Sequence, residues 1–270
     1  FRMCTWAILD LYSCEGAMPP RTADFDGGPA MTGYGQFCPI AKTMEVLDER
    51  WTILIVRELL VGSSHFNELR RGLPRLSPAL LSKRLRSLAR CGIVVRNTEG
   101  NRVRYELTTG GRELAPVVMA LGEWGVRWRS RLGDEDLDPH LLMWDVHRNL
   151  DQNAMPATRT VLAFSFSDVE PRGRDWWIVV EPGAEVDLCD FDPGYPVTVS
   201  ARSSLRTMVR LWRGDISWQH ALRTGDLQLA GTRQACHAFP HWLRRSMFAS
   251  VPRPTQPSPI STPPAGNASR

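Results

Sequence analysis

The segment from Ser77 to Arg90 combines cationic side chains with short ones in a regular spacing. If the segment is helical, one narrow face carries Leu81, Leu85 and Leu88, with Leu80 beside it. The opposite face carries Ala79, Ser82, Lys83, Arg86 and Arg90. Ammonium and guanidinium groups pair with phosphate, and short side chains let a helix approach a surface closely. The pattern therefore predicts a helix with its leucines in a core and its basic face toward a polyanion.

The neighbouring elements indicate what would hold this helix. Ser77 followed by Pro78 is typical of a helix start, as N-cap and first helical residue. A short helix is expected over Phe66–Arg71, and a turn with Gly72 and Pro74 follows it. After the basic helix, β-strands are expected over residues 93–97 and 103–107, and residues 98–102 form a Gly-containing loop of a hairpin. This order of helix, turn, helix and hairpin is that of a winged helix-turn-helix, which places its second helix in the major groove of DNA.

The predicted DNA contacts follow from this arrangement. The first two turns of the second helix would contact base edges, and its cations would reach phosphate or guanine. Arg84 lies on the flank of the helix, where a structural salt bridge is an equal alternative. Arg102 lies at the hairpin tip, and Arg104 points outward because it alternates with apolar neighbours. The predicted contacts are Ser77, Ala79, Ser82, Lys83, Arg84, Arg86, Arg102 and Arg104.

The charge distribution separates DNA binding from a merely solvated basic face. The chain has 270 residues and a net charge of +4. Residues 31–132 carry 17 Lys and Arg against 9 Asp and Glu, whereas residues 133–270 carry 14 against 16. The excess of positive charge therefore lies in the part that contains the helix-turn-helix, as a polyanionic partner requires.

Length and composition predict two domains of the α+β class. A chain of this length with 43% hydrophobic residues can build two cores. We expect a winged-helix domain over 31–132 and, after the polar residues 133–139, a second α+β domain over 138–250. Residues 1–30 are expected to be a disordered extension, with Met31 as the natural start. The proline-rich residues 251–270 are expected to be a disordered tail.

Three further helices are predicted in the first domain. Residues 40–47 and 51–60 are apolar-periodic, and in the second of these Arg57 and Glu58 are expected to face outward. Residues 109–131 predict one long helix whose apolar stripe consists of Leu114, Val117, Val118, Leu121, Trp124 and Trp128. This stripe needs a partner. A second copy of the chain is the favoured partner, and packing back on the N-terminal helices is the alternative.

Other kinds of chemistry find little support in the sequence. The six cysteines include no Cys-x-x-Cys pair. His237 and His241 have a spacing that can bind zinc on a helix, but no third ligand is identifiable. No motif of nucleophilic, phosphate-binding or dinucleotide-binding sites is present, and no apolar run approaches the ~20 residues of a membrane span. We therefore expect a cytoplasmic protein that is not an enzyme and has no metal, cofactor or membrane partner.

From Phe37 to about Trp128 the chain resembles the HxlR-type branch of the MarR-like winged-helix regulators. The matching residues are Cys38-Pro39, Trp51-Thr52-Ile53-Leu54-Ile55, Arg57-Glu58-Leu59, Phe66-Asn67-Glu68-Leu69, Leu76-Ser77, Leu80-Leu81-Ser82, Arg84-Leu85, Leu88, Gly92, Tyr105-Glu106-Leu107-Thr108, Gly111 and Trp124-Gly125. The resemblance implies a transcriptional regulator that binds a palindromic operator in double-stranded DNA as a homodimer.

The resemblance also concerns Cys38 and two departures from the family pattern. In some members the cysteine of the Cys-Pro pair senses oxidants, and Cys38 aligns with it. A small buried hydrophobe is the alternative role for this residue. Asp48-Glu49-Arg50 stands where Gly-Gly-Lys is usual, and the wing loop is short and lacks proline.

The second domain resembles the sterol carrier protein fold. The resemblance rests on residues 176–180 and 186–189, the Leu211-Trp212-Arg213-Gly214-Asp215 turn, Ala221-Leu222 and residues 227–231. Strands are expected over 160–166, 176–181, 185–188, 197–200 and 227–230, and helices over 140–150, 205–212, 217–222 and 233–245.

The sterol carrier fold implies an apolar cavity that holds a lipid-like or other hydrophobic molecule. An extra domain of this kind on a regulator predicts that the molecule controls DNA binding. The five tryptophans of this half fit a cavity wall or an ordinary core equally well; they are Trp176, Trp177, Trp212, Trp218 and Trp242. The alternatives are a carrier of hydrophobic molecules or an enzyme tethered to DNA, and a dimerisation domain without a ligand.

Overall fold

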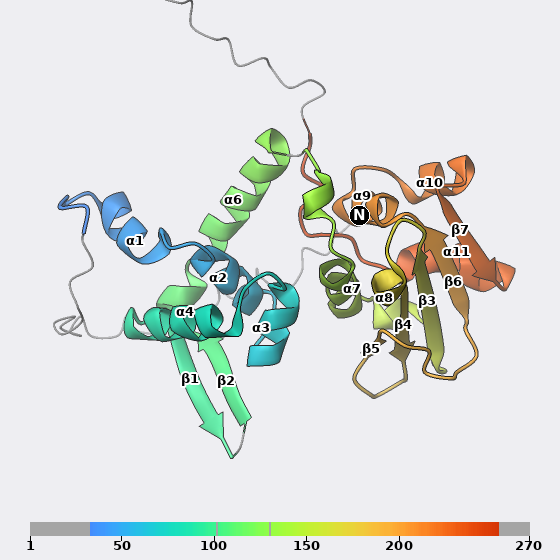
Figure 1. Ribbon diagram of the computed structural model, residues 1–270, viewed down its shortest axis with the longest axis horizontal. Helices are drawn as coiled ribbons and strands as arrows, with labels where there is room; N and C mark the ends of the chain where they lie inside the picture. Colours follow the sequence, from blue (N-terminus) through green and yellow to red (C-terminus); the bar gives the residue numbers. More distant parts are fainter. Residues whose placement is uncertain (1–32, 101, 130, 254–270) are drawn as a thin grey trace, which may run out of the picture. The chain divides into compact units, whose positions relative to one another are not determined.

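The computed structural model describes residues 33–100, 102–129 and 131–253 (Figure 1). The expectations for residues 1–30 and for position 101 of the hairpin loop therefore lie outside the described residues. The expected disordered tail over 251–270 lies outside them from residue 254 on. For residues 251–253 that expectation was wrong, because Val251 N donates to Phe248 O at 3.1 Å and Arg253 pairs with Asp215.

The chain forms two compact units, one up to Glu45 and one from Val46 onward. Helix α1 (Pro39–Leu47) begins in the first unit. Within this helix Lys42 Nζ forms a salt bridge with Glu45 Oε1, one turn later, at 2.9 Å.

The second unit begins with the winged helix. Its elements are α2 (Thr52–Leu60), α3 (Phe66–Gly72), α4 (Pro78–Arg90), β1 (Val94–Glu99), β2 (Arg102–Leu107), α5 (Thr109–Arg112) and α6 (Ala115–Trp128). The Ser77 hydroxyl accepts a hydrogen bond from Leu80 N at 3.3 Å, and Pro78 is the first helical residue of α4. Leu81, Leu85 and Leu88 are all buried against α2 and the hairpin. The predicted start and inner face of α4 are thus confirmed.

The hairpin is longer than expected. Thr98 pairs with Val103 and Glu99 with Arg102, so only positions 100 and 101 connect the strands. Gly100 has a φ of 59°, the left-handed conformation that a two-residue hairpin loop demands. The expectation of a loop over residues 98–102 was wrong, because local composition does not show how far cross-strand pairing continues.

A third backbone segment extends the small sheet. His65 forms a β-bridge with Arg104, and Tyr105 N donates to Ser64 O at 2.7 Å. The sequence analysis missed this link, since one bridging residue has no periodic pattern. The link ties the start of α3 to the hairpin, so the first helix of the helix-turn-helix and the wing are held by one hydrogen-bonded ladder.

The expected long helix over residues 109–131 is divided into α5 and α6. Pro116 is the second residue of α6, and its ring nitrogen has no hydrogen to donate to the preceding turn. Gly111 is buried beside β1, where a Cβ atom would lie 2.2 Å from Ile93 O. The chain therefore turns closely against the sheet before α6 begins, and both residues explain why one continuous helix was a wrong expectation.

The C-terminal half (residues 138–253) contains a five-stranded sheet in the order β5-β4-β3-β6-β7. Strands β3 and β6 are parallel, and the other neighbours are antiparallel. The strands are β3 (Thr160–Phe166), β4 (Asp175–Val180), β5 (Asp187–Cys189), β6 (Val199–Ser203) and β7 (Leu227–Gly231). The longer helices are α7 (Pro139–Arg148), α9 (Leu205–Arg213), α10 (Trp218–Thr224) and α11 (Arg233–Trp242), with the short α8 (Pro171–Arg174) before β4. The mixed α+β class is as predicted.

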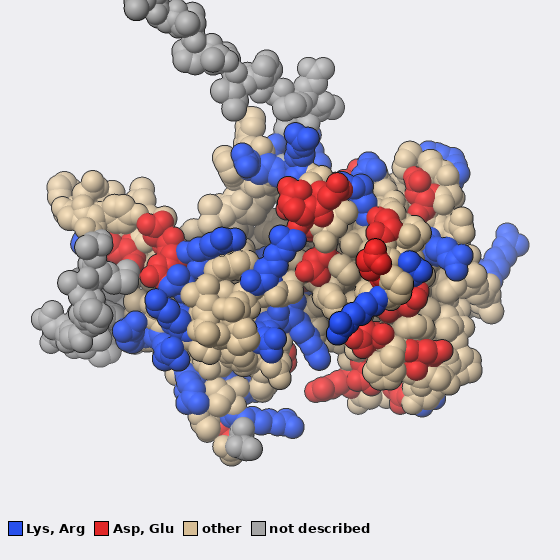
Figure 2. Space-filling view, in the orientation of Figure 1, with Lys and Arg blue, Asp and Glu red and all other residues tan. Residues whose placement is uncertain are grey.

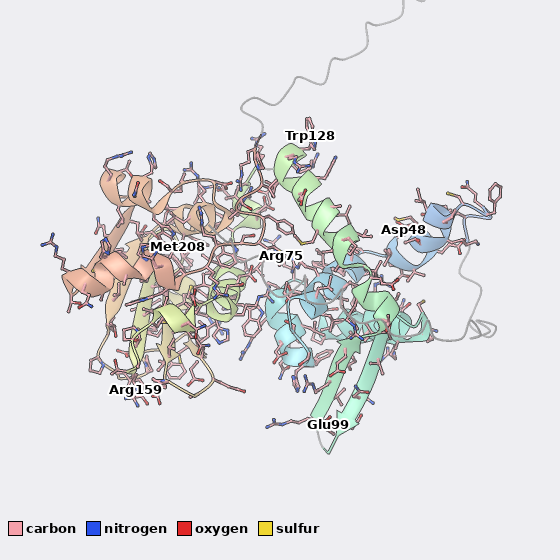
Figure 3. All side chains as sticks on the ribbon, turned by 180° about the vertical axis from the view of Figure 1, so that it is seen from behind. Asp48, Arg75, Glu99, Trp128, Arg159 and Met208 are labelled. Atoms are coloured by element: carbon pink, nitrogen blue, oxygen red, sulfur yellow. The ribbon has the colours of Figure 1, made fainter. Side chains whose placement is uncertain are left out.

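Large side chains fill the interior of this half. Phe164 on β3 and Phe239 on α11 are fully buried, with ring centroids 5.9 Å apart. Met208 on α9 (Figure 3) and Ile178 on β4 belong to the same cluster. Trp218 packs edge-on against Phe239, and Trp242 is buried beside it. Trp176 belongs to the same buried cluster and Trp212 packs against it, so four of the five tryptophans belong to this core or pack against it.

Glu58 overturns another expectation. Its side chain was expected to face solvent, but it is completely buried. Its carboxylate accepts hydrogen bonds from Arg57 Nη2 at 2.6 Å and from Arg148 Nη1 at 2.7 Å. Arg148 belongs to α7, so this ion pair joins α2 of the winged helix to the C-terminal half. The helical periodicity of α2 could not show a partner that follows 90 residues later.

The segment after α11 returns to α6. Phe248 lies against Gly122, where a Cβ atom would come within 2.2 Å of the phenyl ring. Arg253 Nε pairs with Asp215 Oδ1 at 2.7 Å and holds this segment on the C-terminal half. One face of α6 is therefore covered by the chain's own C-terminal segment.

Candidate nucleic-acid interface

Helix α4 presents its basic face to solvent. Ser77, Ala79, Lys83 and Arg86 are exposed, and Ser82 is half-buried between them. Cationic side chains gather over this part of the molecule (Figure 2). Within the described ranges, neither Lys83 nor Arg86 forms a salt bridge. Both charges are therefore available to an external anion.

Arg84 occupies a different environment. Its side chain is only 13% exposed and forms an ion pair with Glu49. Its Nε also donates to Arg50 O at 3.2 Å. Of the two roles considered for Arg84, this geometry favours the structural salt bridge. Glu49 belongs to the tripeptide that departs from the family pattern, so that departure supplies the counter-ion for α4.

The wing places its two predicted arginines on one face of the hairpin. Arg102 pairs across the strands with Glu99 at the tip (Figure 3), and Arg104 pairs with Asn97. Residues alternate between the faces of a strand, so both arginines point away from the side that carries the buried Leu107. Arg104 Nε lies 3.6 Å from Glu106 Oε1, and both side chains are 44% exposed. A pair this exposed in water is weak and leaves Arg104 free to contact phosphate.

One further cation of the hairpin was missed by the sequence analysis. Arg96 on β1 is exposed, and its Nη1 donates to Thr98 Oγ1 at 3.2 Å. It pairs with Tyr105 and therefore lies on the opposite face of the hairpin from Arg102 and Arg104. Alternation along β1 places Arg96 on the same face as the buried Val94, so the available signal was only the cationic side chain itself within the predicted strand 93–97.

The apolar stripe predicted on α6 separates into two sets. Four of its members are between 43% and 58% exposed and lie on one side of the helix; they are Val117, Leu121, Trp124 and Trp128. Trp128 marks the last turn of α6 in Figure 3. Val118 and Leu114 instead pack into the core of the winged helix. The alternative of packing on the same chain therefore applies to these two residues, and the exposed stripe needs a separate partner.

The remaining predicted sites, Cys38 and the pair His237 and His241, lie in segments of the chain other than α4 and the hairpin. Cys38 is a half-buried free thiol immediately before α1. The rings of His237 and His241 lie 6.4 Å apart on α11. Among residues 33–100, 102–129 and 131–253, no three His, Cys, Asp or Glu side chains gather as a metal site. In the same ranges no helix is long and apolar enough to cross a membrane.

Comparison with known proteins matches residues 46–132 to the HxlR-like helix-turn-helix family. An uncharacterised HTH-type transcriptional regulator of Bacillus subtilis, YvaP, is 38% identical over 97 residues, which cover 34% of this chain and 90% of that protein. The chain belongs to the HxlR-like family. A second uncharacterised HTH-type regulator, sll1512 of Synechocystis, is 39% identical over 97 residues, which cover 35% of this chain and 72% of that protein. Among solved structures, the reduced form of the redox regulator HypR is 34% identical and has a TM-score of 0.31. The match covers 33% of this chain and 90% of HypR.

Membership in the HxlR-like family confirms the prediction of a DNA-binding helix-turn-helix regulator. The matched segment contains α2 to α6 and hence the basic face of α4, the wing and the apolar stripe. It ends at residue 132, so the C-terminal half lies beyond it. The sterol-carrier resemblance of that half stays a prediction.

Proposed function

We propose that this HxlR-like protein is a cytoplasmic, sequence-specific transcription factor that binds a palindromic operator as a homodimer. The observation that carries the proposal is the exposed cationic face of α4 above its buried leucines. In this arrangement α4 enters the major groove, and Arg102 contacts the adjacent minor groove or phosphate. Arg84 keeps α4 in place through Glu49. Two-fold symmetry presents two copies of α4 and therefore selects a palindrome.

The exposed stripe on α6 supports the homodimer. Four large apolar side chains on successive turns of one helix seldom remain in water on a soluble protein. A second copy carries the same stripe, and a two-fold axis brings the two together without a further partner. Leu114 and Val118, which belong to the winged-helix core, would support the interface from behind.

Binding to DNA from the gene's own upstream region tests the operator proposal. We expect the full chain to bind this duplex, and not a scrambled one, in fluorescence anisotropy. Raising the salt concentration should weaken binding steeply, because each neutralised phosphate contributes about −0.9 to the slope of log K against log salt. Equal affinity for native and scrambled duplexes at every salt concentration would contradict sequence-specific binding at that site.

The dimer proposal predicts the effect of one charge on the stripe. Leu121→Arg should convert the dimer to a monomer in sedimentation velocity, because the guanidinium would be buried without a partner. The matched control is Glu123→Arg on the same helix, whose side chain is 42% exposed and off the stripe. A Leu121→Arg protein that remains dimeric at micromolar concentration would show that the stripe is not the interface.

For the C-terminal half we propose a sensor role in which a hydrophobic small molecule modulates DNA binding. The proposal keeps the predicted division into a winged-helix domain (31–132) and a sterol-carrier-like domain (138–250). Its support is a cleft that Trp176 of this half and Arg71 of α3 line together, because Phe164 and Phe239 fill the interior of the half itself. The alternatives are a carrier or enzyme tethered to DNA, which would transport or convert the molecule, and a dimerisation domain without a ligand.

A redox role for Cys38 also stays a proposal. It predicts that the thiol reacts with diamide in the folded protein and that the reaction changes operator affinity. A thiol that stays unmodified until the protein is unfolded would support the buried-hydrophobe alternative instead.

A further inference from the structure

A cleft of about 510 Å³ lies where α3 of the winged helix faces the C-terminal half. Helix α3 contacts α7 directly, and the strands β4 and β5 complete the wall. The volume is within the range of pockets for small organic molecules, about 300 to 1,000 Å³. The cleft is distinct from the basic face of α4 and from the packed interior around Phe164.

One wall of the cleft is aromatic and rigid. Trp144 on α7 is 7% exposed and Trp176 on β4 is 4% exposed. The Nε1 of Trp176 donates to Gly173 O at 2.8 Å, and the ring of His140 packs edge-on against it at 4.9 Å. Leu188 on β5 adds an aliphatic surface. Both indoles are largely buried, so only a small part of each ring faces the cleft. That part is fixed in position and can contact the rim of a flat apolar guest without reordering.

The opposite wall is cationic. Arg70 and Arg71 on α3 are both exposed, and in the part of the chain that the structure describes neither lies within salt-bridge distance of a carboxylate. Arg71 Cζ lies 5.2 Å from the centre of the Trp144 ring, so the guanidinium already stands beside the aromatic wall. Asp190 at the rim is the one opposing carboxylate in the lining. Two guanidinium groups outweigh it.

The charge of Arg71 also affects the pKa of His147 on α7. Burial lowers the pKa of His147, and the charge of Arg71 lowers it further, against a hydrogen bond to Val186 O that raises it. The His147 ring stacks on Trp144 at 5.1 Å. His147 lies behind Trp144 and does not line the cleft, and its lowered pKa disfavours a further positive charge beside that ring.

We propose that this cleft binds a small aromatic carboxylate, with its ring against Trp144 and Trp176 and its carboxylate on Arg70 and Arg71. Guanidinium groups pair with carboxylates in a planar, bidentate geometry, and an uncharged lipid-like guest would desolvate them without compensation. The inference rests on the proposed small-molecule partner of the C-terminal half and names its site and chemical class. Such a guest bridges the first helix of the helix-turn-helix and the C-terminal half.

The test is calorimetric titration of the full chain with 2-naphthoate and with the uncharged 2-naphthamide. We expect one naphthoate per chain and at least tenfold weaker binding of the amide. The Arg70→Gln/Arg71→Gln variant should lose at least tenfold in naphthoate affinity. The control is Arg90→Gln/Arg96→Gln, which removes the same charge from exposed positions outside the cleft. Leu188→Glu places a carboxylate in the cleft while Arg70 and Arg71 stay in place. It should weaken naphthoate binding by charge repulsion.

Three results would overturn the site. They are no naphthoate binding, equal affinity for acid and amide, and undiminished naphthoate binding by the Arg70→Gln/Arg71→Gln variant. Titration with the uncharged dye Nile red separates this inference from the broader proposal. If the dye binds and naphthoate does not, a hydrophobic partner remains and the anionic cleft is excluded. If neither binds, both proposals fail, whereas DNA binding is tested independently.

Discussion

Replacement of Lys83 and Arg86 together by alanine is expected to abolish specific operator binding. Both side chains are exposed on the basic face of α4, and Leu81 and Leu85 on the other face keep the helix in the core. Each lost contact to a base edge costs about 1–3 kcal/mol, so the pair should lose roughly 30-fold to more than 10⁴-fold in affinity. Anisotropy with the operator duplex measures the loss. Where one of the two residues contacts phosphate instead of a base, its removal should decrease the salt slope by about one.

The same variant should keep its far-ultraviolet circular dichroism and melting temperature. Exposed side chains without ion-pair partners contribute little to stability, commonly within about 0.5 kcal/mol. The matched control is Arg223→Ala/Arg233→Ala, which removes two exposed charges from the C-terminal half. Its operator affinity should change little. Retained specific affinity in the Lys83→Ala/Arg86→Ala protein would disprove α4 as the DNA-contacting helix.

The second large effect is expected for Arg148→Ala. This guanidinium pairs with Glu58 Oε2 at 2.7 Å and with Asp145 on its own helix. Its removal leaves the fully buried carboxylate of Glu58 and the partly buried carboxylate of Asp145, with Arg57 as a remaining cation that acts on both. Loss of one member of a buried ion pair typically costs about 3–5 kcal/mol, because the remaining charge has lost both water and its partner. Urea denaturation at neutral pH should show a loss in the free energy of unfolding of this order.

The control for Arg148→Ala is Arg127→Ala. Arg127 pairs with Glu123 one turn away on α6 at 3.0 Å, with both side chains more than 40% exposed. Such surface pairs contribute about 0.3–0.5 kcal/mol, so the control should unfold almost like the wild type. A loss below about 1 kcal/mol for Arg148→Ala would mean that the buried pair does not join α2 to α7 in solution.

The cost of Arg148→Ala should also depend on pH. Burial would raise the pKa of Glu58, but hydrogen bonds and charge from Arg148 and then Arg57 outweigh it and hold this pKa below its ordinary value. The stabilisation from Glu58 is therefore present above its unfolded-state pKa and is lost as the pH falls through the folded-state value. Burial raises the pKa of Asp145, so its charged form becomes a cost as the pH rises. Both effects make the penalty for removing Arg148 largest near neutral pH and smaller in acid.

Features that depend on near neighbours in the chain were predictable from the sequence. The start of α4 follows from Ser77 and Pro78, whose hydrogen bond and fixed dihedral act within one turn. Its inner face follows from leucines spaced three and four apart. The outward direction of Arg102 and Arg104 follows from the alternation of a strand. These local rules were sufficient for the fold class of the first domain and for the positions of most candidate DNA-contact residues on α4 and the hairpin, whose contacts with DNA stay a prediction.

Features that depend on distant partners were not predictable. Glu58 looked like a surface residue until α7 brought Arg148 to it. Arg84 had two equal interpretations until Glu49 was found beside it. The extent of the hairpin and the break before α6 depended on cross-strand pairing and on the close contact of Gly111 with Ile93. In each case two residues far apart in sequence decide the outcome, and neither carries a local sign of the other.

The sequence by itself therefore determined that this chain contains a winged helix-turn-helix with a basic second helix, because helix caps, periodicity and regional charge are local or additive properties. The tertiary structure alone decided which cations are free for DNA, which part of the α6 stripe remains exposed, and where arginines of α3 meet the indoles of the C-terminal half. The physical reason is that exposure and pairing are properties of two surfaces brought together. A sequence pattern predicts which residues lie on the surface of one helix or strand, but it does not predict which other element packs against that surface.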